Sequence, residues 1–370
     1  MSIVSRLSEQ HRKQAERLLW TWRDRFCNTI VDLPATDLIA HRIPTIRCKP
    51  VRIKNALFTQ KEVEWQRKHL PDMLSAGIID WVNSPWSAKT KFPAKKNGDL
   101  RMVHAFCPIN DVTIKSNYPM KRIEPILNSL SSSKFKIFWY ADGANGYWAV
   151  PMWKPHAFKT AFSTVLGQFA YLRMGQGLSG APHTYAQLKD LATGHIPKPH
   201  SEDSLTGDRE DGAFHTFFDD HLGADTTFEN QMGFLHERYF PRLHWAKLVL
   251  NPAKRHFFME SISMLGFSAD GSGLRPNDSK LKALCDYPTP RTEAELDSFI
   301  HMTTYLRKFI PGRAEHVRIM QTAIKKVPVT VLDEAKRRDN LEKAWRWRER
   351  KQRVEQDPGW KSLATGTPAS

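Results

Sequence analysis

Two aromatic segments that each end in aspartate constrain this chain most. The first is FKIFWYA at 135–141, followed by Asp142, and the second is FHTFF at 214–218, followed by the adjacent pair Asp219 and Asp220. Aromatic and β-branched residues favour strands. Two adjacent carboxylates repel each other, and each prefers water or a counter-charge. The pattern therefore predicts two strands with acidic ends and a positive partner near the second.

The Asp219–Asp220 pair has two interpretations. Aspartate is common in turns, so the pair could lie in a solvated turn or cap a helix. If the two aromatic strands are instead neighbours in one sheet, three carboxylates meet at their ends. Oxygen ligands of this kind suit magnesium or manganese. Two such ions, about 3.5–4 Å apart, stabilise the attacking and leaving oxygens of phosphoryl transfer.

The charge balance suggests a partner. The chain has 55 Lys and Arg against 39 Asp and Glu, a net charge of +16, and such a field attracts polyanions. Nucleic acid is the first partner to consider, although charge alone also fits a soluble basic protein. The four cysteines form no CxxC pair, which argues against a zinc site or disulfide framework. With no signal-peptide core and no run of eighteen apolar residues, no membrane role is expected.

Local patterns predict further elements. Thr59 with Glu62, and Thr292 with Glu295, form capping-box pairs that mark two helix starts. The pair Asn97-Gly98 predicts a tight turn between two strands. Other predictions are helices at 8–26, 71–77, 181–192, 228–240 and 295–310, strands at 147–152 and 168–173, and a long surface loop at 195–212.

A glycine pattern from Gly175 to Gly180 matches GxGxxG between a strand and a helix. The surroundings lack a repeating βαβ unit with an acidic residue about twenty positions on, so a dinucleotide fold is disfavoured. The glycines still let the backbone approach a ligand closely. Near the Asn-Gly turn, Lys95, Lys96 and Arg101 could bind a triphosphate or form a solvated basic turn.

The order of these blocks resembles the reverse transcriptase of gypsy-type long-terminal-repeat retrotransposons, in particular those of fungi, over roughly residues 40–325. The resemblance is carried by NSPWSAKTKFPAKKNGDLRMVHAFCPIN, YADGANGYWAVPM, YLRMGQGLSGAPHTYAQL, FFDD, SMLGF and the segment from LRPNDSKLKALCDYPTP to YLRKFIP. It implies an α+β right-hand polymerase fold with an antiparallel palm sheet. The expected division is a lead-in at 1–50, fingers and palm at 51–270, a thumb at 271–326 and a basic tail at 327–370.

The resemblance also implies a role for each matching residue. Catalysis and metal binding would fall to three aspartates, Asp142, Asp219 and Asp220. One turn, formed by Leu265 and Gly266, would position the primer. Five residues would bind the nucleotide: Lys95, Arg101, Tyr147, Gln176 and Gly177. Tyr147 would be the gate that excludes a ribose 2′-hydroxyl.

The activity implied is RNA-directed DNA synthesis with two Mg²⁺ or Mn²⁺ ions, a primed RNA or DNA template and deoxynucleotides. The expected location is cytoplasmic, in virus-like particles, or nuclear. Ala105, Phe106 and Cys107 stand where many relatives have Asp-Tyr-Arg, and Phe217 stands where tyrosine is commoner. Because no ribonuclease H or integrase segment is recognised after the thumb-like region, the alternative is a truncated, catalytically silent nucleic-acid-binding remnant.

Overall fold

The computed structural model describes residues 7–54, 57–94, 98–194, 204–290 and 292–324. The predicted basic tail at 327–370 lies outside these residues. The chain divides into two compact units, one of residues 1–264 and 269–274 and the other of 265–268 and 275–370. Among the described residues, no helix combines the length and apolarity needed to cross a membrane.

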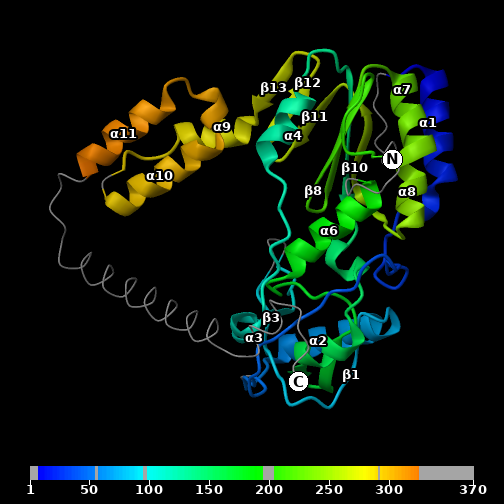
Figure 1. Cartoon of the computed structure of the whole chain (residues 1–370), viewed down its shortest axis with the longest axis vertical. Helices are drawn as coiled ribbons and strands as arrows, with labels where there is room; N and C mark the ends of the chain where they lie inside the picture. Colours follow the sequence, from blue (N-terminus) through cyan, green and yellow to red (C-terminus); the bar gives the residue numbers. More distant parts are fainter. Residues whose placement is uncertain (1–6, 55–56, 95–97, 195–203, 291, 325–370) are drawn as a thin grey trace, which may run out of the picture. The chain divides into compact units, whose positions relative to one another are not determined.

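An antiparallel five-stranded sheet organises the first unit (Figure 1). Its strand order is β10-β4-β9-β8-β7, so the two aromatic segments of the sequence are in the same sheet, on either side of β9. The strands are β4 (Ile137–Gly143), β7 (Gly207–Asp208), β8 (Gly212–Phe217), β9 (Asp220–Asp225) and β10 (Leu250–Met259).

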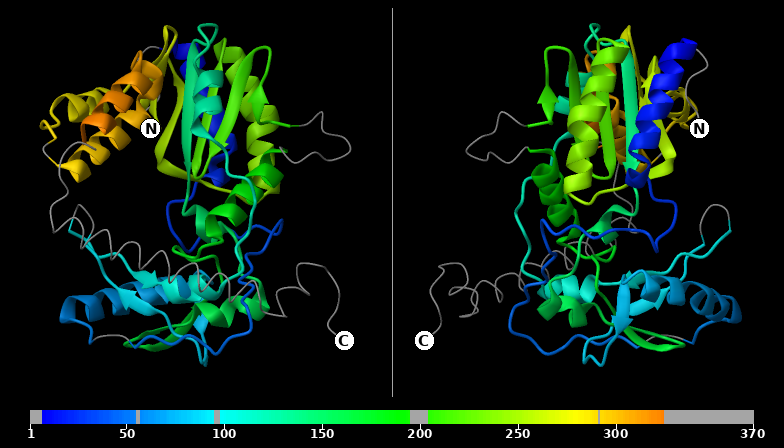
Figure 2. Two further views of the ribbon diagram at one scale, coloured as in Figure 1. Left: turned by 60° about the vertical axis from the view of Figure 1, so that its left-hand side comes forward. Right: turned by 90° about the vertical axis from the view of Figure 1, so that its right-hand side faces the viewer.

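Helices cover both faces of this sheet. The views in Figures 1 and 2 place α1, α7 and α8 on one face and α4 on the other. A further helix, α6, packs against α8. These elements are α1 (Glu9–Thr21), η1 (Arg23–Arg25), α4 (Ile123–Leu130), α6 (Ala181–Thr193), α7 (Phe228–Gly233), the π-helical η5 (Phe234–Tyr239) and α8 (Phe240–Trp245).

Aromatic side chains form the core between the sheet and the α7–α8 layer. Trp139 of β4 is fully buried and stacks on Phe214 of β8, with ring centroids 5.4 Å apart. Tyr239 meets the same indole edge-on at 4.7 Å. Burial of such rings supplies most of the driving force for packing a sheet against helices. The same packing holds β4, β8 and β9 in register at the acidic end of the sheet.

The first unit also contains two small antiparallel sheets, of order β1-β6-β5 and β2-β3. The predicted pairing of the two hairpin strands is confirmed, since Lys89 pairs with Ala105 across β2 and β3. Asn97 of the predicted turn lies outside the described residues. These elements are α2 (Gln60–Ser75), β1 (Ile79–Trp81), β2 (Lys89–Lys91), β3 (Val103–Ala105), α3 (Cys107–Val112), η2 (Gly146–Ala149), α5 (Lys154–Ala157), η3 (Phe158–Thr160), β5 (Phe162–Thr164) and β6 (Gly167–Tyr171).

Three local predictions were wrong. Helix α2 continues through Pro71 instead of restarting there, because Leu70 and Met73 are buried and packing outweighs one lost hydrogen bond. The segment 147–152 is not a strand, since a 3-10 turn at its start follows the left-handed residue Asn145. The predicted loop at 195–212 contains the short edge strand β7, and its last residue, Gly212, already begins β8. Residues 195–203 of this segment lie outside the described part.

The second unit is mainly helical. The predicted capping box at Thr292 is present, with its hydroxyl accepting from the Glu295 amide at 3.2 Å. Tyr305 stacks on Phe267 at 4.9 Å, which anchors α10. The helices are α9 (Asp278–Cys285), α10 (Glu293–Tyr305), η6 (Arg307–Phe309) and α11 (Arg313–Ile324). The remaining sheet has the order β11 (Ser261–Met264), β12 (Phe267–Asp270), β13 (Gly273–Pro276), and its strand β11 belongs to the first unit.

Candidate active site

Strand pairing brings the predicted carboxylates to one end of the five-stranded sheet. Strands β4 and β9 are antiparallel neighbours, and their register places Asp142 directly opposite Asp220. Residues paired in this way have Cβ atoms about 4.5–5.5 Å apart. The two aromatic strands, β4 and β8, share this sheet but are not direct neighbours, because β9 lies between them. The carboxylates still meet at one end of the sheet, because Asp220 is the first residue of β9.

A two-residue turn presents the third carboxylate. Phe217 of β8 pairs with Asp220 of β9, which leaves Phe218 and Asp219 as the turn itself. Phe218 has φ of 49°, the left-handed conformation that favours glycine. Turns with a left-handed first residue match the twist of the flanking strands. A bulky residue accepts such strain at a cost of about 1–3 kcal/mol, which is typical of functional sites.

Each carboxylate lies beside a donor or cation of the protein. The Tyr140 hydroxyl donates to Asp220 Oδ1 at 2.6 Å, and the Lys254 ammonium lies 3.4 Å from Asp142 Oδ2. The Tyr185 hydroxyl faces Asp219 from α6, since both would contact a Cβ placed on Gly146. These groups hold the three aspartates in place.

Burial and like charge both act on the acidic pair. Burial raises the pKa of Asp219, and the Lys189 ammonium opposes that rise. Burial also raises the pKa of Asp220, and the neighbouring Asp142 and Asp219 raise it further, against the Tyr140 hydrogen bond. Carboxylates with raised pKa values in one cluster bind positive charge readily.

The donor set fits divalent metal ions. Asp219 Oδ1 is buried and has no well-directed hydrogen-bond partner in the described part of the chain, so this oxygen could bind a metal ion. The donors are carboxylate oxygens, which suit magnesium or manganese. As they stand, no three acidic, His or Cys side chains among the described residues form a ready-made metal cage. The aspartates instead face protein donors.

Gly146 and two tyrosines form the wall next to Asp219. A Cβ at Gly146 would lie 2.2 Å from Asp219 Oδ1 and 2.4 Å from the Tyr185 hydroxyl oxygen, so only glycine fits there. Tyr147, the predicted sugar gate, meets the Tyr185 ring edge-on at 5.5 Å. Burial, then the Asp219 charge, raises the pKa of Tyr147. The structure thus brings Tyr147 to the carboxylate cluster.

Two predicted nucleotide-binding residues contact each other. The Arg101 guanidinium donates to the side-chain carbonyl of Gln176, and both side chains are exposed. Asn110 supports this loop, because its amide donates to the Gly177 carbonyl at 2.8 Å and accepts from the Ser179 amide at 2.9 Å. The remaining member of the set, Lys95, lies outside the described residues.

The predicted primer-binding residues, Leu265 and Gly266, form the turn between β11 and β12. Both have positive φ, 49° and 74°, as in a type I′ hairpin turn. The Gly266 carbonyl accepts from the Asn277 amide at 3.1 Å. The turn is well formed, and its role in holding a primer end stays a prediction.

Sequence reasoning missed four side chains around the carboxylates: Tyr140, Tyr185, Lys189 and Lys254. Three of them carried a readable signal. Tyr140 lies two residues before Asp142 and therefore on the same face of its strand. Tyr185 and Lys189 are four residues apart in α6 and share one helix face. Nothing in the local sequence indicated Lys254, which reaches Asp142 from the paired strand β10.

These features define a class of protein, and solved structures agree with it. The foamy viral protease-reverse transcriptase in complex with dsDNA aligns with a TM-score of 0.74 at 19% identity, over 95% of this chain and 69% of that one. The same protein in complex with an RNA/DNA hybrid aligns with a TM-score of 0.71 at 18% identity, over 95% and 44%. The chain has the α+β fold of reverse transcriptases.

Sequence relatives give the family. The Pol polyprotein of transposon opus from Drosophila melanogaster is 30% identical over 291 residues, 74% of this chain and 27% of that protein. That of transposon 297 is 28% identical over 299 residues, 80% of this chain and 27% of that protein. The Tf2-7 polyprotein of Schizosaccharomyces pombe is 25% identical over 253 residues, 68% of this chain and 18% of that protein.

The chain belongs to the Pol polyproteins of gypsy-type retrotransposons, of which it corresponds to the reverse transcriptase region. It spans about a quarter of the length of the Drosophila relatives. No protein-family model matches the chain.

Proposed function

We propose that this chain is an RNA-directed DNA polymerase that extends a primer with deoxynucleotides. The observation that carries the proposal is the register of β4 and β9, which sets Asp142 opposite Asp220 with Asp219 in the adjoining turn. Three carboxylates on three neighbouring chain segments suit the two-metal chemistry of nucleotidyl transfer. The similarity in fold to reverse transcriptases in complex with RNA/DNA hybrid and with dsDNA supports the same proposal.

Asp142, Asp219 and Asp220 would hold two Mg²⁺ or Mn²⁺ ions. When bound, such ions polarise the phosphate and stabilise the attacking and leaving oxygens. The contacts of Tyr140 with Asp220 and of Lys254 with Asp142 keep the carboxylates apart without metal. The side chains therefore provide a preorganised set of ligands, a condition for strong electrostatic stabilisation.

The loop around Gln176 would bind the incoming nucleotide. Arg101 offers several N–H donors that suit triphosphate oxygens, and Gly177 at φ of 93° brings bare backbone to the surface. Asn110 supports that backbone from α3. Arg101 would have to exchange its contact with Gln176 for phosphate.

Template and primer would be held mainly through their phosphates by the basic surface. The net charge of +16 supports this, since each neutralised phosphate releases counterions. Binding should weaken steeply with salt and depend little on sequence.

The second candidate is a nucleic-acid-binding remnant without turnover. One observation favours it: Phe106 is buried and Cys107 opens α3, at positions where many members of the resembled family carry Asp-Tyr-Arg. The chain has no arginine at position 107 to make the template contact expected of that family. A weakened template contact would lower activity while leaving phosphate-driven binding in place.

Primer extension by the purified chain separates the two candidates. An RNA template with an annealed DNA primer is incubated with deoxynucleotides, with Mg²⁺ or with a chelator. Extension with Mg²⁺ alone is the expected result. Salt-sensitive binding of the primed template without any extension would retire the polymerase proposal in favour of the remnant.

Substituting Tyr147 tests the predicted sugar gate. Tyr147→Ala is expected to admit ribonucleotides about a hundredfold more readily, because a hydroxyl is rejected only where a side chain occupies its space. The measurement is the ratio of kcat/KM for a deoxynucleotide and the matching ribonucleotide. Tyr147→Phe keeps the ring and should keep the ratio. An unchanged ratio in the alanine variant would remove Tyr147 from this role.

A further inference from the structure

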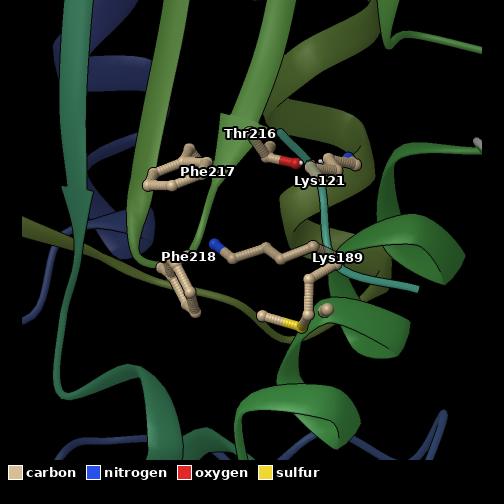
Figure 3. Close-up of a pocket in the computed structure, with 7 residues that line it drawn as sticks. Lys121, Lys189, Thr216, Phe217 and Phe218 are labelled. Atoms are coloured by element: carbon tan, nitrogen blue, oxygen red, sulfur yellow. Dashed lines mark hydrogen bonds between the residues drawn. The ribbon is translucent and has the colours of Figure 1, made fainter. Parts of the chain in front are cut away.

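A buried lysine lies behind the acidic turn. Lys189 is 3% exposed in α6, and Figure 3 shows its side chain extending from the helix so that its amino group ends near Phe217 and Phe218. Its Nζ would lie 3.6 Å from a Cβ placed on Gly143, at the end of β4. Fully buried lysines are rare unless paired.

The side chain that contacts the Lys189 ammonium accepts a hydrogen bond from it but carries no negative charge. Its ammonium contacts His221 Nε2. An ammonium can only donate, so Nε2 accepts, Nδ1 carries the imidazole proton, and Nδ1 donates to the Tyr239 hydroxyl at 3.0 Å. Within the described residues no carboxylate lies at ion-pair distance from Lys189.

The second lysine of the pocket is a useful contrast. Lys121 lies 2.8 Å from Asp190 Oδ1 and donates to the Thr216 hydroxyl at 2.9 Å. Asp190 is buried and therefore neutralises Lys121 locally. The pocket that these lysines line measures about 20 Å³, room for about one water. It is too small for an anionic ligand, so the Lys189 charge acts on the protein itself.

The groups that respond to Lys189 are the aspartates. Burial lowers the pKa of Lys189 to about 8, with Asp219 opposing that fall more strongly than Asp220 or Asp142. The same ammonium opposes the rise that burial causes in the pKa of Asp219 and Asp220. At neutral pH the lysine is mostly charged, and its field reaches the cluster through protein of low dielectric.

From this geometry we infer that Lys189 is a positioning residue, a built-in counter-cation that stabilises the metal-free carboxylate cluster and weakens its hold on divalent ions. The inference rests on the proposed function, because it concerns the same site. A cluster of three carboxylates alone would bind metal tightly and repel itself when empty. Lys189 offsets part of that repulsion from behind the turn, where no solvent screens it.

Mn²⁺ binding tests this inference without any turnover. Mn²⁺ is added to the full chain, and electron paramagnetic resonance measures the Mn²⁺ that stays free. Binding at the acidic site is the part of the Mn²⁺ binding that an Asp219→Asn, Asp220→Asn variant loses. Lys189→Met is expected to bind Mn²⁺ at this site at least about tenfold more tightly, since removing a buried positive charge favours a cation. Lys13→Met is the matched control: it removes the same charge from an exposed position on α1 and should leave affinity unchanged.

Thermal unfolding separates this role from simple packing. Metal-free Lys189→Met should unfold at a lower temperature than the metal-free parent. Saturating Mn²⁺ should raise the unfolding temperature of Lys189→Met by more than it raises that of the parent. Lys189→Gln is a second variant, which stays neutral but can still donate to His221, and it should show the same tightening.

Each outcome decides a different claim. Folded Lys189 variants with parental or weaker Mn²⁺ affinity would overturn the inference while leaving the metal site intact. If the parent binds no more Mn²⁺ than the double aspartate variant, the metal site of the proposed function fails and the inference fails with it. If neither neutral variant folds, even with Mn²⁺ present, Lys189 is a packing residue and the inference is wrong.

Discussion

Substituting Asp219→Asn and Asp220→Asn together is expected to lower nucleotide incorporation by at least about a thousandfold. Electrostatic stabilisation of the transferring phosphate is the largest catalytic contribution in such sites, and losing even one well-placed group costs about 10²–10³ in kcat. Asparagine has nearly the same shape, so the change removes two charges and leaves the turn in place. Steady-state primer extension with Mg²⁺ measures the loss.

The fold of this variant should survive. Burial raises the pKa of both aspartates and neighbouring carboxylates raise it further, so keeping the pair ionised costs stability in the metal-free chain. Neutral side chains should leave the thermal unfolding temperature unchanged or higher. Asp72→Asn with Asp297→Asn removes the same charge from exposed positions and should keep parental activity. Substantial incorporation by the Asp219, Asp220 variant would exclude these residues as the metal-binding pair.

The substitution Gly146→Ala is expected to lower incorporation by about a hundredfold. The added methyl would lie 2.2 Å from Asp219 Oδ1 and 2.4 Å from the Tyr185 hydroxyl, both held in a buried wall. Displacing a catalytic group by about 1 Å can cost 10² in rate. The effect should appear in kcat, measured by single-turnover extension, because the methyl moves a carboxylate and not the nucleotide loop.

Gly233→Ala is the matched control. Gly233 ends α7, and a Cβ there would meet nothing within 4 Å. Alanine favours the helix by about 1 kcal/mol relative to glycine, so this variant should be slightly more stable and equally active. Parental kcat in Gly146→Ala would mean that Asp219 can move aside without loss, which would contradict a rigid catalytic role.

Tertiary packing, more than local pattern, explains where the secondary-structure predictions failed. Pro71 carries a strong local signal for a helix start, yet Leu70 and Met73 are buried and keep α2 continuous. Tyr147 and Trp148 have strand propensity, but Gly146 must pass close to Asp219 and Tyr185, and the chain turns there instead. Propensity is a weak preference that such contacts override.

The identity of the acidic site was readable from the sequence alone. Aromatic strands that end in Asp142 and in Asp219–Asp220, together with the order of the surrounding blocks, predicted the carboxylates and the family. That information is local: strand propensity and turn chemistry act between residues close in sequence.

What surrounds the carboxylates was decided only by the tertiary structure. Lys254 reaches Asp142 from a strand more than a hundred residues later, and Lys189 meets His221 across 32 positions. The charge that a buried lysine exerts depends on which residues exclude water from it and on how far the aspartates lie. Those quantities exist only once the chain has packed, so the sequence was enough to propose the metal ligands, and the fold determined their electrostatic setting.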